Sequence, residues 1–391
     1  MEGDFIKIND WLLPLSWIYG AGVRRRNQMF EMGMLKSRSF DIPVISVGNI
    51  TVGGSGKTPH VEYLINLLRD KVKVAVLSRG YKRKSKGYML ATADTPMSDI
   101  GDEPYQMKKK FADIYVAVDK DRCHGIDQLT TNEETSDTDV ILLDDAYQHR
   151  YVKPGVNILL VDYHRLIMYD KLLPAGRLRE PQKGKARADI VIVSKCPADL
   201  KPMEFRVITK AMNLFPYQKL YFTTLKYGSL RPIYGGEDRK LDTLTGDTSI
   251  LLLTGIASPQ QMIVDLKPYT ERITPLTFPD HHQYTDADID RINAEFEAMK
   301  GNDKMIVTTE KDNARLCGME GLSDEVKKNI YVLPVEVGFM LDQEEDFNEN
   351  IIGYVRKNSR NSILAKAKDD NKSDNSDNSG NRTRTISFRN N

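Results

Sequence analysis

The chain contains a glycine-rich stretch at residues 46–58, SVGNITVGGSGKT, between a β-branched run and a helical pattern. Its ending Gly56-Lys57-Thr58 is typical of a phosphate-binding loop, in which backbone N–H groups face the phosphates and the lysine reaches the outer ones. Thr51 occupies the position of the usual first glycine. A residue other than glycine fits there if φ stays negative, so we interpret the stretch as a nucleotide site. The alternative is an ordinary glycine-rich turn between a strand and a helix.

Short β-branched runs alternate with helical patterns along most of the chain. This alternation predicts an α/β fold with a P-loop NTPase-like parallel sheet flanked by helices. Several runs are apolar at consecutive positions, as expected for strands that are buried on both faces. The expected strands are residues 43–49, 73–80, 116–119, 139–145, 157–162 and 189–195.

Glycine and proline cluster at residues 228–236, where the character of the sequence changes. We place a domain boundary there and expect a second, smaller α/β domain after it. The last segment is polar and cannot bury enough apolar surface to offset the entropy of ordering it. The expected units are an N-terminal helix at 1–36, a P-loop domain at 37–227, a second α/β domain at 228–356 and a disordered polar tail at 357–391.

The N-terminal segment combines an apolar run with a cluster of positive charge. The run of roughly ten residues is much shorter than the approximately 20 that a spanning helix needs. Both tryptophans of the chain, Trp11 and Trp17, precede Arg24, Arg25 and Arg26. Aromatic side chains beside arginines are typical of a helix in the interface of an anionic membrane. The alternative is a helix that docks on the protein core with its arginines in water.

Composition argues against some classes of function. The net charge of +1 gives no reason to expect nucleic-acid binding. Cys123, Cys196 and Cys317 are far apart in the sequence, so no pair resembles a metal-binding knuckle. An odd number of cysteines without a signal peptide favours a reducing compartment over a disulfide framework.

A magnesium ligand is expected opposite the glycine-rich loop, at the end of an apolar strand. Asp144 and Asp145 follow the apolar residues 140–143 and provide a carboxylate that would face Thr58 across the metal. A GTPase would also carry Asn-Lys-x-Asp on a late strand, but the nearest candidate, residues 194–197, lacks both the Asn and the Asp. We therefore expect ATP as the nucleotide and Mg²⁺ as its metal.

Three further polar clusters are candidates for the reacting centre. They are Asp102 with Glu103 in GDEP, Arg177 with Arg179 and Glu180 in LPAGRLRE, and Asp280 with His281 and His282 in PDHH. Each cluster also has a plain structural interpretation, as a helix cap, a surface ion pair or a turn. The residues alone do not decide between the two interpretations.

The order of these motifs resembles that of a known family. SVGNITVGGSGKTP, LSRGY, GDEP, DDAYQHR, LPAGRLRE, DHH and TTEKD follow one another as in the tetraacyldisaccharide 4′-kinases, the lipid A 4′-kinases of Gram-negative bacteria. The similarity extends from PLSWIYG near the N-terminus to about Val337. The threonine at position 51 is a feature of this family's loop.

The resemblance implies an enzyme of lipid A (lipopolysaccharide) biosynthesis. It would transfer the γ-phosphate of ATP to the 4′-hydroxyl of an acylated glucosamine disaccharide 1-phosphate. The protein would be monotopic, on the cytoplasmic face of the inner membrane, with its N-terminal helix on the lipid surface. No nucleic acid and no protein partner are implied.

The resemblance also assigns catalytic roles. Asp102 would be the base that takes the proton of the hydroxyl, assisted by His281. These residues come from different predicted domains, so the second domain would have to close over the active site. Lys57 and Arg179 would stabilise the charge of the transferred group.

Binding roles follow from the same resemblance. The ATP site would comprise Thr51, Val52, Gly53, Gly54, Ser55, Gly56, Lys57, Thr58 and Arg122. The Mg²⁺ ligands would be Thr58, Asp144, Asp145 and, through water, Glu180. The substrate-side residues would be Glu103 and His149. Arg24 to Arg26 would bind either the 1-phosphate of the substrate or lipid headgroups.

Two other classes of function stay open. A P-loop NTPase switch or metallochaperone-like protein would couple hydrolysis to a partner, and it predicts a guanine-reading motif or a Cys/His metal cluster. A non-catalytic peripheral membrane protein would leave Lys57, Thr58, Asp144 and Asp145 without a role.

Overall fold

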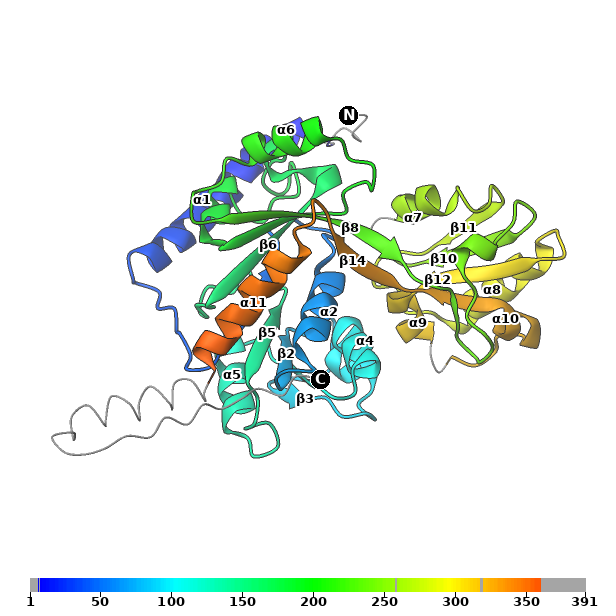
Figure 1. Cartoon of the computed structure of the whole chain (residues 1–391), viewed down its shortest axis with the longest axis horizontal. Coiled ribbons are helices and arrows are strands. Elements are labelled where there is room, and N and C mark those ends of the chain that lie inside the picture. Colours follow the sequence, from blue (N-terminus) through cyan, green and yellow to red (C-terminus); the bar gives the residue numbers. More distant parts are fainter. Residues whose placement is uncertain (1–5, 7, 257–258, 317–318, 360–391) are drawn as a thin grey trace.

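The larger part of the molecule is built on a nine-stranded sheet with strand order β14-β8-β7-β6-β1-β5-β2-β4-β3 (Figure 1). The structure is a computed structural model that describes residue 6 and residues 8–256, 259–316 and 319–359. Neighbouring strands from β8 to β4 pair in parallel, while β3 and β14 are antiparallel at the two edges. The strands are β1 Val44–Gly48, β2 Val74–Ser78, β3 Met89–Leu90, β4 Tyr115–Val118, β5 Val140–Asp144, β6 Val156–Asp162, β7 Ile190–Ser194, β8 Lys219–Tyr227 and β14 Val335–Phe339.

Helices cover both faces of this sheet because its central strands are apolar on both sides. In β1, Ile45 and Val47 pack with one set of helices, whereas Val44 packs on the opposite face. The first set is α2 Lys57–Leu68, α4 Asp102–Lys110 and α11 Glu344–Asn358. The opposite face carries α5 Arg122–Thr131 and α6 Pro202–Met212. The short α3 Met97–Ile100 precedes α4. The expected parallel sheet with flanking helices is confirmed.

A separate five-stranded sheet has the order β11-β10-β12-β13-β9. Its strands are β9 Arg231–Pro232, β10 Ser249–Thr254, β11 Ile273–Thr277, β12 Lys304–Thr309 and β13 Ile330–Leu333. Its helices are α7 Pro259–Leu266, α8 Asp286–Ala298, α9 Glu310–Leu316 and α10 Asp324–Asn329. Thr285 caps α8 through the backbone N–H of Asp288, and α8 packs on a hydrophobic core formed within this unit.

Two antiparallel strands, β8 and β14, connect the sheets (Figure 1). The chain leaves the large sheet through β8 and returns through β14, after which α11 packs on the large sheet. Residues 335–358 therefore lie on the large sheet, although we expected 228–356 to form one unit. Pro334 lies between β13 and β14, where a proline without an N–H for the ladder interrupts the run 330–337.

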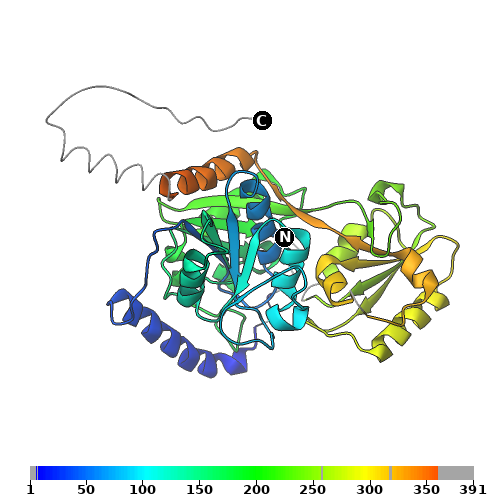
Figure 2. The same ribbon diagram turned by 90° about the horizontal axis from the view of Figure 1, so that it is seen from below.

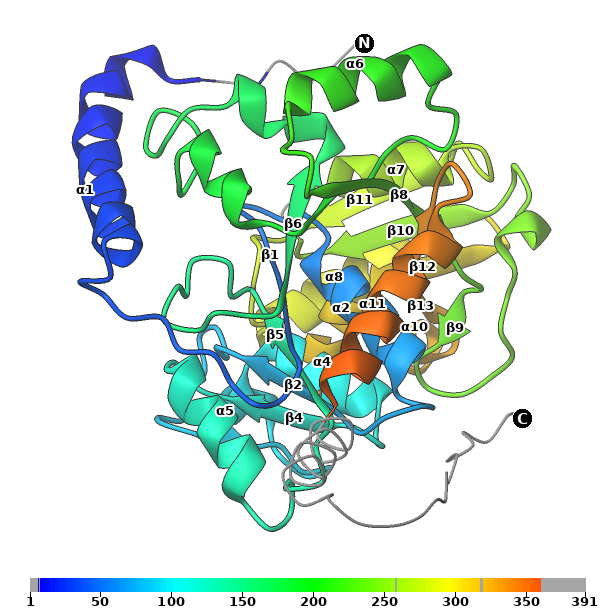
Figure 3. The same cartoon turned by 60° about the vertical axis from the view of Figure 1, so that its left-hand side comes forward.

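The N-terminal helix α1, Leu13–Glu31, lies apart from α11, along the edge of the larger unit (Figures 2 and 3). Trp11, Trp17 and Ile18 are exposed by 76%, 67% and 71%, so this apolar face has no cover among the described residues. None of the helices in the described part of the chain has the length and apolar character that crossing a bilayer requires. Of the expected tail at 357–391, residues 360–391 lie outside the described residues.

Candidate active site

The glycine-rich loop joins the carboxyl end of β1 to the first turn of α2. Gly53 and Gly56 have φ values of +116° and +77°, which glycine adopts without the steric cost that a side chain brings. The side-chain amide of Asn49 donates to Ser55 Oγ at 2.8 Å and braces the loop from within. The loop therefore has the backbone that its glycines predict.

Thr51 lies in an extended segment at the start of this loop. It forms an antiparallel bridge with Leu178, and the N–H of Val52 donates to the carbonyl of Arg177 at 2.8 Å. The backbone of Thr51 is thus extended and paired with Leu178, and it does not form a tight turn. For this reason no glycine is needed at position 51. The pairing also brings Arg177 and Arg179 beside the loop.

Two aspartates follow β5, next to the loop. Because β1 and β5 are parallel neighbours and Val47 pairs with Asp144, their carboxyl ends meet at one edge. Lys57 Nζ and Arg179 Nη1 each lie 3.6 Å from the carboxylate of Asp145. Asp144 is 1% exposed, and its Oδ1 has no hydrogen-bond partner among the described residues.

The two carboxyl groups are perturbed in opposite directions. Burial, with the charges of Glu103 and Asp145, raises the pKa of Asp144 to about 7. Burial acts in the same way on Asp145, but Lys57 and Arg179 outweigh it and lower the pKa of that carboxyl. The positive charges of Lys57 and Arg122 therefore do not offset burial and the neighbouring acids at Asp144. Because one carboxylate oxygen of Asp144 has no hydrogen-bond partner among the described residues, the donor set fits a hard divalent cation such as Mg²⁺.

Asp102 and His281 meet across the two units. Asp102 begins α4, and its Oδ2 lies 2.8 Å from His281 Nδ1 and 2.5 Å from Arg315 Nη2. Burial opposes ionisation of Asp102. The hydrogen bond with His281 and the charges of Lys311 and Arg315 outweigh it and hold the pKa well below its usual range.

Lys311 connects this pair to the surrounding acids. Its ammonium lies 3.2 Å from Glu103, 3.8 Å from Asp280 and 3.9 Å from Asp102. These acids outweigh the effect of burial and raise the pKa of Lys311. The lysine is therefore a fixed cation at the junction of the two units.

Two cavities lie near the junction of the two units, and the Asp102–His281 pair lines one of them. The first, of about 240 Å³, is lined by the loop residues 54–58, Glu103, Asp280 and Lys311, together with apolar side chains from β8 and β14. The second, of about 250 Å³, is lined by Asp102 and His281 with Tyr81, Lys82 and Arg315. One cavity is thus lined by the loop, and the other by the Asp102–His281 pair.

An ionic bridge joins the two units beside the first cavity, where α4 contacts α9 (Figure 1). Lys110 Nζ lies 2.6 Å from Glu62 on α2 and 2.8 Å from Glu310 on α9. Its charge is therefore shared by carboxylates from both units. This bridge holds α9, and with it Lys311 and Arg315, against the P-loop unit.

Comparison with known proteins identifies the family. The family model described as tetraacyldisaccharide-1-P 4′-kinase matches residues 8–356. The tetraacyldisaccharide 4′-kinase of Phocaeicola vulgatus is 61% identical over 93% of this chain and 99% of its own length. The corresponding protein of Bacteroides fragilis is 54% identical over 95% of this chain and 100% of its own length.

A solved structure agrees with the sequence matches. The crystal structure of LpxK from Aquifex aeolicus, described as the "apo" form in complex with ATP, has a TM-score of 0.68 and 31% identity. The match covers 89% of this chain and 99% of that one. This chain belongs to the tetraacyldisaccharide 4′-kinase family. The resemblance drawn from the motifs is thereby confirmed, and membership favours a kinase over an NTPase switch or a non-catalytic membrane protein.

The other residues expected at the kinase site differ in their contacts with Asp144 and the loop. Arg122 is buried and donates to the carbonyl oxygen of Asp144 at 3.4 Å. Glu180 is bound by Arg187 at 2.9 Å and by Asn27 at 3.2 Å, so its role at the metal stays a prediction. His149 is half-buried, and burial, with nearby arginines, lowers its pKa to about 4.

Sequence reasoning did not single out Arg315 or the bridging role of Lys311. Arg315 is buried, and besides Asp102 it binds Asp312 at 3.0 Å and the carbonyl of Gly255 at 2.9 Å. The available signal was helical spacing, since Arg315 follows Lys311 by one turn on α9 and so shares its face. Nothing local in the sequence reveals that this face meets Asp102.

Proposed function

We propose that this kinase transfers the γ-phosphate of ATP to the 4′-hydroxyl of a tetraacylated glucosamine disaccharide 1-phosphate. The product would be the bisphosphorylated, lipid IVA-type precursor of lipid A. One observation carries the proposal: Lys311 lines the cavity of the phosphate-binding loop and also contacts Asp102, so loop and acid–base pair belong to one site. The family supports this acceptor, and the ATP in the Aquifex aeolicus structure supports the donor.

The donor half of the site would be the loop from Thr51 to Thr58. Its N–H groups and the start of α2 would face the phosphates, and Lys57 would reach the outer ones. Arg179 would share the developing charge, since it and Lys57 already lie at equal distance from Asp145. Arg122, behind Asp144, would add a further positive charge.

Thr58, Asp144 and Asp145 would hold Mg²⁺, with Glu180 as a more remote contributor through water. When bound, the ion would offset the charge of the phosphates and of the buried Asp144. The fit rests on the raised pKa of Asp144 and its unpartnered oxygen.

The acceptor hydroxyl would give its proton to the Asp102–His281 pair. Asp102 would take the proton, and His281 would orient the carboxylate and stabilise its charge through the 2.8 Å contact. Glu103, which shares Lys311 with Asp102, and His149 would lie on the substrate side. The hydroxyl would enter from the second cavity, where Asp102 and His281 are accessible.

Helix α1 would rest on the membrane that holds the acylated substrate. Trp11, Trp17 and Ile18 would enter the interface, and the exposed Arg24 and Arg25 would meet anionic headgroups. Since both tryptophans of the chain lie here, emission excited selectively from tryptophan reports this contact. A blue shift of this emission with anionic vesicles is expected, and no shift would contradict the contact. Trp11→Ala/Trp17→Ala has no tryptophan emission, so its expected loss of vesicle binding is measured by co-sedimentation.

Arg26 differs from its two neighbours. It donates to the carbonyl of Gln148 and lies over the ring of Phe30, 5.2 Å from the centroid. It is therefore anchored to the protein, whereas Arg24 and Arg25 are exposed. We assign the headgroup contact to Arg24 and Arg25 and a structural role to Arg26.

The deciding experiment is transfer of ³²P from γ-labelled ATP to a detergent-solubilised tetraacyldisaccharide 1-phosphate. Wild type is compared with Lys57→Ala and Asp102→Asn, with circular dichroism as a control for folding. Labelled lipid that is reduced at least 100-fold in both variants supports the proposal, because each change removes charge stabilisation or proton transfer worth roughly that factor. ATP hydrolysis without labelled lipid would show that the acceptor is wrong.

A further inference from the structure

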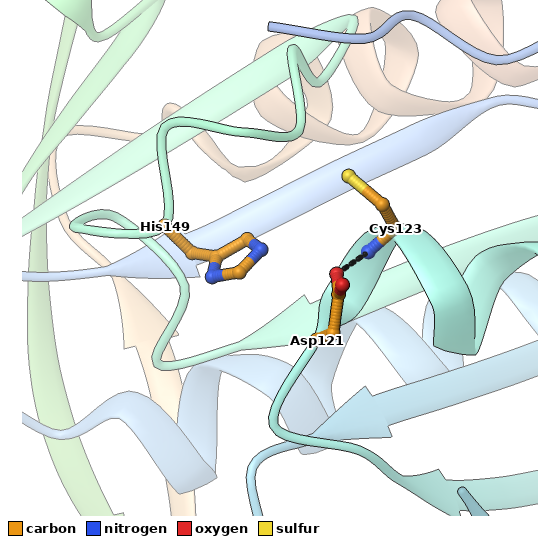
Figure 4. A group of neighbouring side chains, drawn as sticks. All are labelled: Asp121, Cys123 and His149. Carbon is orange, nitrogen blue, oxygen red and sulfur yellow. Dashed lines mark hydrogen bonds between the residues drawn. The ribbon is translucent and has the colours of Figure 1, made fainter. Parts of the chain in front are cut away.

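A second group of metal-ligating side chains lies beside the kinase site. Asp121, Cys123 and His149 each offer one ligand atom, and these atoms all lie within 4.8 Å of one another (Figure 4). Asp121 precedes α5, Cys123 lies in its first turn, and His149 comes from the segment after β5. The fold thus joins two segments that are not adjacent in the sequence.

The three side chains have unused ligand atoms. His149 Nε2 is buried and has no hydrogen-bond partner among the described residues. Cys123 is a free thiol. Asp121 Oδ1 accepts from the N–H groups of Cys123 and His124 at 2.9 and 3.4 Å, so one oxygen holds the start of α5 while the other is available. An unpaired buried imidazole nitrogen is costly, and a bound cation would satisfy it.

We propose that Asp121, Cys123 and His149 form a binding site for a divalent cation of the zinc class. Imidazole, thiolate and carboxylate are the ligands that Zn²⁺ prefers, with water in the fourth tetrahedral position. Mg²⁺ prefers oxygen ligands alone and would stay with Asp144 and Asp145. Arg122 lies between two of the ligands in the sequence, and its guanidinium turns inward to the carbonyl of Asp144.

The charges around the site determine how many anionic ligands a divalent cation would need there. Arg122, Arg26 and Arg79 all disfavour a positive charge at His149, so they oppose a cation as well. Two anionic ligands are therefore needed to neutralise a dication. The imidazole offers its unpartnered Nε2, and Cys123 would bind as the thiolate. Binding would break the S–H bond, form a sulfur–metal bond and release one proton to the buffer.

The site has a consequence that rests on the proposed function. His149 is one of the proposed substrate-side residues, and a cation on its Nε2 would remove it from the acceptor. Zinc should therefore inhibit phosphate transfer at saturating Mg²⁺ and ATP. Cys123→Ser should keep the basal rate and lose at least tenfold in sensitivity to zinc, because Cys123 itself has no part in the kinase site.

The direct test is a titration of the full chain with Co²⁺, in excess Mg²⁺ and a reductant without thiols. The near-ultraviolet thiolate-to-cobalt charge-transfer band reports a cobalt–sulfur bond without any need for activity. One equivalent of Co²⁺ should produce the band in wild type. Zn²⁺ should abolish it by displacing the cobalt.

Variants separate this site from other ligands. Cys123→Ser should lack the band, while His149→Gln and Asp121→Asn should bind Co²⁺ at least tenfold more weakly. Asparagine still caps a helix, so Asp121→Asn removes the charge and keeps the start of α5. His124→Gln is the matched control, because His124 lies in the same turn but pairs with Asp119 at 2.6 Å, and this variant should bind as wild type does.

Each outcome has a clear meaning. No band in wild type, a band that survives in Cys123→Ser, or equal loss in His124→Gln overturns the site. A Cys123-dependent band in a chain that labels no lipid supports the site and overturns the proposed function instead. Equal inhibition by zinc of wild type and Cys123→Ser would overturn the link between the site and the acceptor.

Discussion

The neutral substitution Asp144→Asn should stabilise the protein while it abolishes activity. Burial and the nearby acids raise the pKa of Asp144 to about 7. In that case the folded chain holds a proton here that the unfolded chain, with an ordinary carboxyl, has already lost. Stability in the absence of a metal ion therefore falls as pH rises from about 4 to about 7. Asparagine does not ionise, so it avoids this cost.

The magnitude follows from the size of the shift. Each pKa unit corresponds to about 1.4 kcal/mol, so the advantage of Asp144→Asn should grow by about that amount per pH unit and level off near pH 7 at about 4 kcal/mol. Since each kcal/mol moves the midpoint of a unit of this size by roughly 2–4 °C, the gain is measurable by thermal unfolding. The assay compares wild type and variant in EDTA from pH 5 to 8.

Asp145→Asn is the matched control with the opposite sign. Lys57 and Arg179 lower the pKa of Asp145 against the effect of burial, so its carboxylate stabilises the fold above the ordinary carboxyl pKa. The variant should be less stable than wild type by a constant amount from pH 5 to 8, and the deficit should shrink only below the ordinary carboxyl pKa. Mg²⁺ with ATP should raise the midpoint of wild type more than that of either variant. An Asp144→Asn protein no more stable than wild type at pH 8 would refute this reasoning.

Three further predictions concern the environments of single residues. Arg315→Gln removes the closest cation from Asp102, so the pKa of that carboxyl should rise. The acidic limb of the kcat/KM profile should then move to higher pH, and an unmoved limb would exclude Asp102 as the titrating group. Burial lowers the pKa of His60 to about 4, so wild type should lose about 3 kcal/mol of unfolding free energy as pH falls from 6.5 to 4. In urea titrations, His60→Gln should lose less unfolding free energy over the same pH range. Glu310→Gln breaks the ion pair from Lys110 to the second unit. The variant should lower kcat/KM about fivefold, corresponding to about 1 kcal/mol, with the thermal midpoint little changed. A normal kcat/KM would show that the ion pair does not hold the two units together for catalysis.

The sequence predicts the features that depend on local pattern. The loop, the aspartates after β5 and the alternation of strands and helices are encoded over short windows, where hydrophobic periodicity and glycine positions decide the structure. Thr285 as the cap of α8 is of the same kind. The tolerance of the loop for threonine at position 51 is predictable in the same way, because a residue other than glycine fits there if its φ is negative.

Features that join distant segments could not be read in this way. The partners Asp102 and Arg315 are 213 residues apart, and no periodicity specifies which helix face meets which. The return of 335–358 to the large sheet depends on which strand edge is free, a property of the assembled sheet. The grouping of Cys123 with His149 has the same origin, since no knuckle spacing connects them.

The environment of Asp102 explains how a kinase of this kind could avoid wasteful hydrolysis of ATP. A carboxylate whose pKa lies well below its usual range is a poor base, so it does not activate water while His281, Arg315 and Lys311 all contact it. Arg315 is anchored by Asp312, whereas Lys311 is the most distant of the three at 3.9 Å and is shared with other acids. Lys311 is therefore the contact that an acceptor hydroxyl would replace most easily, and its loss would raise the basicity of Asp102 only when the acceptor is present.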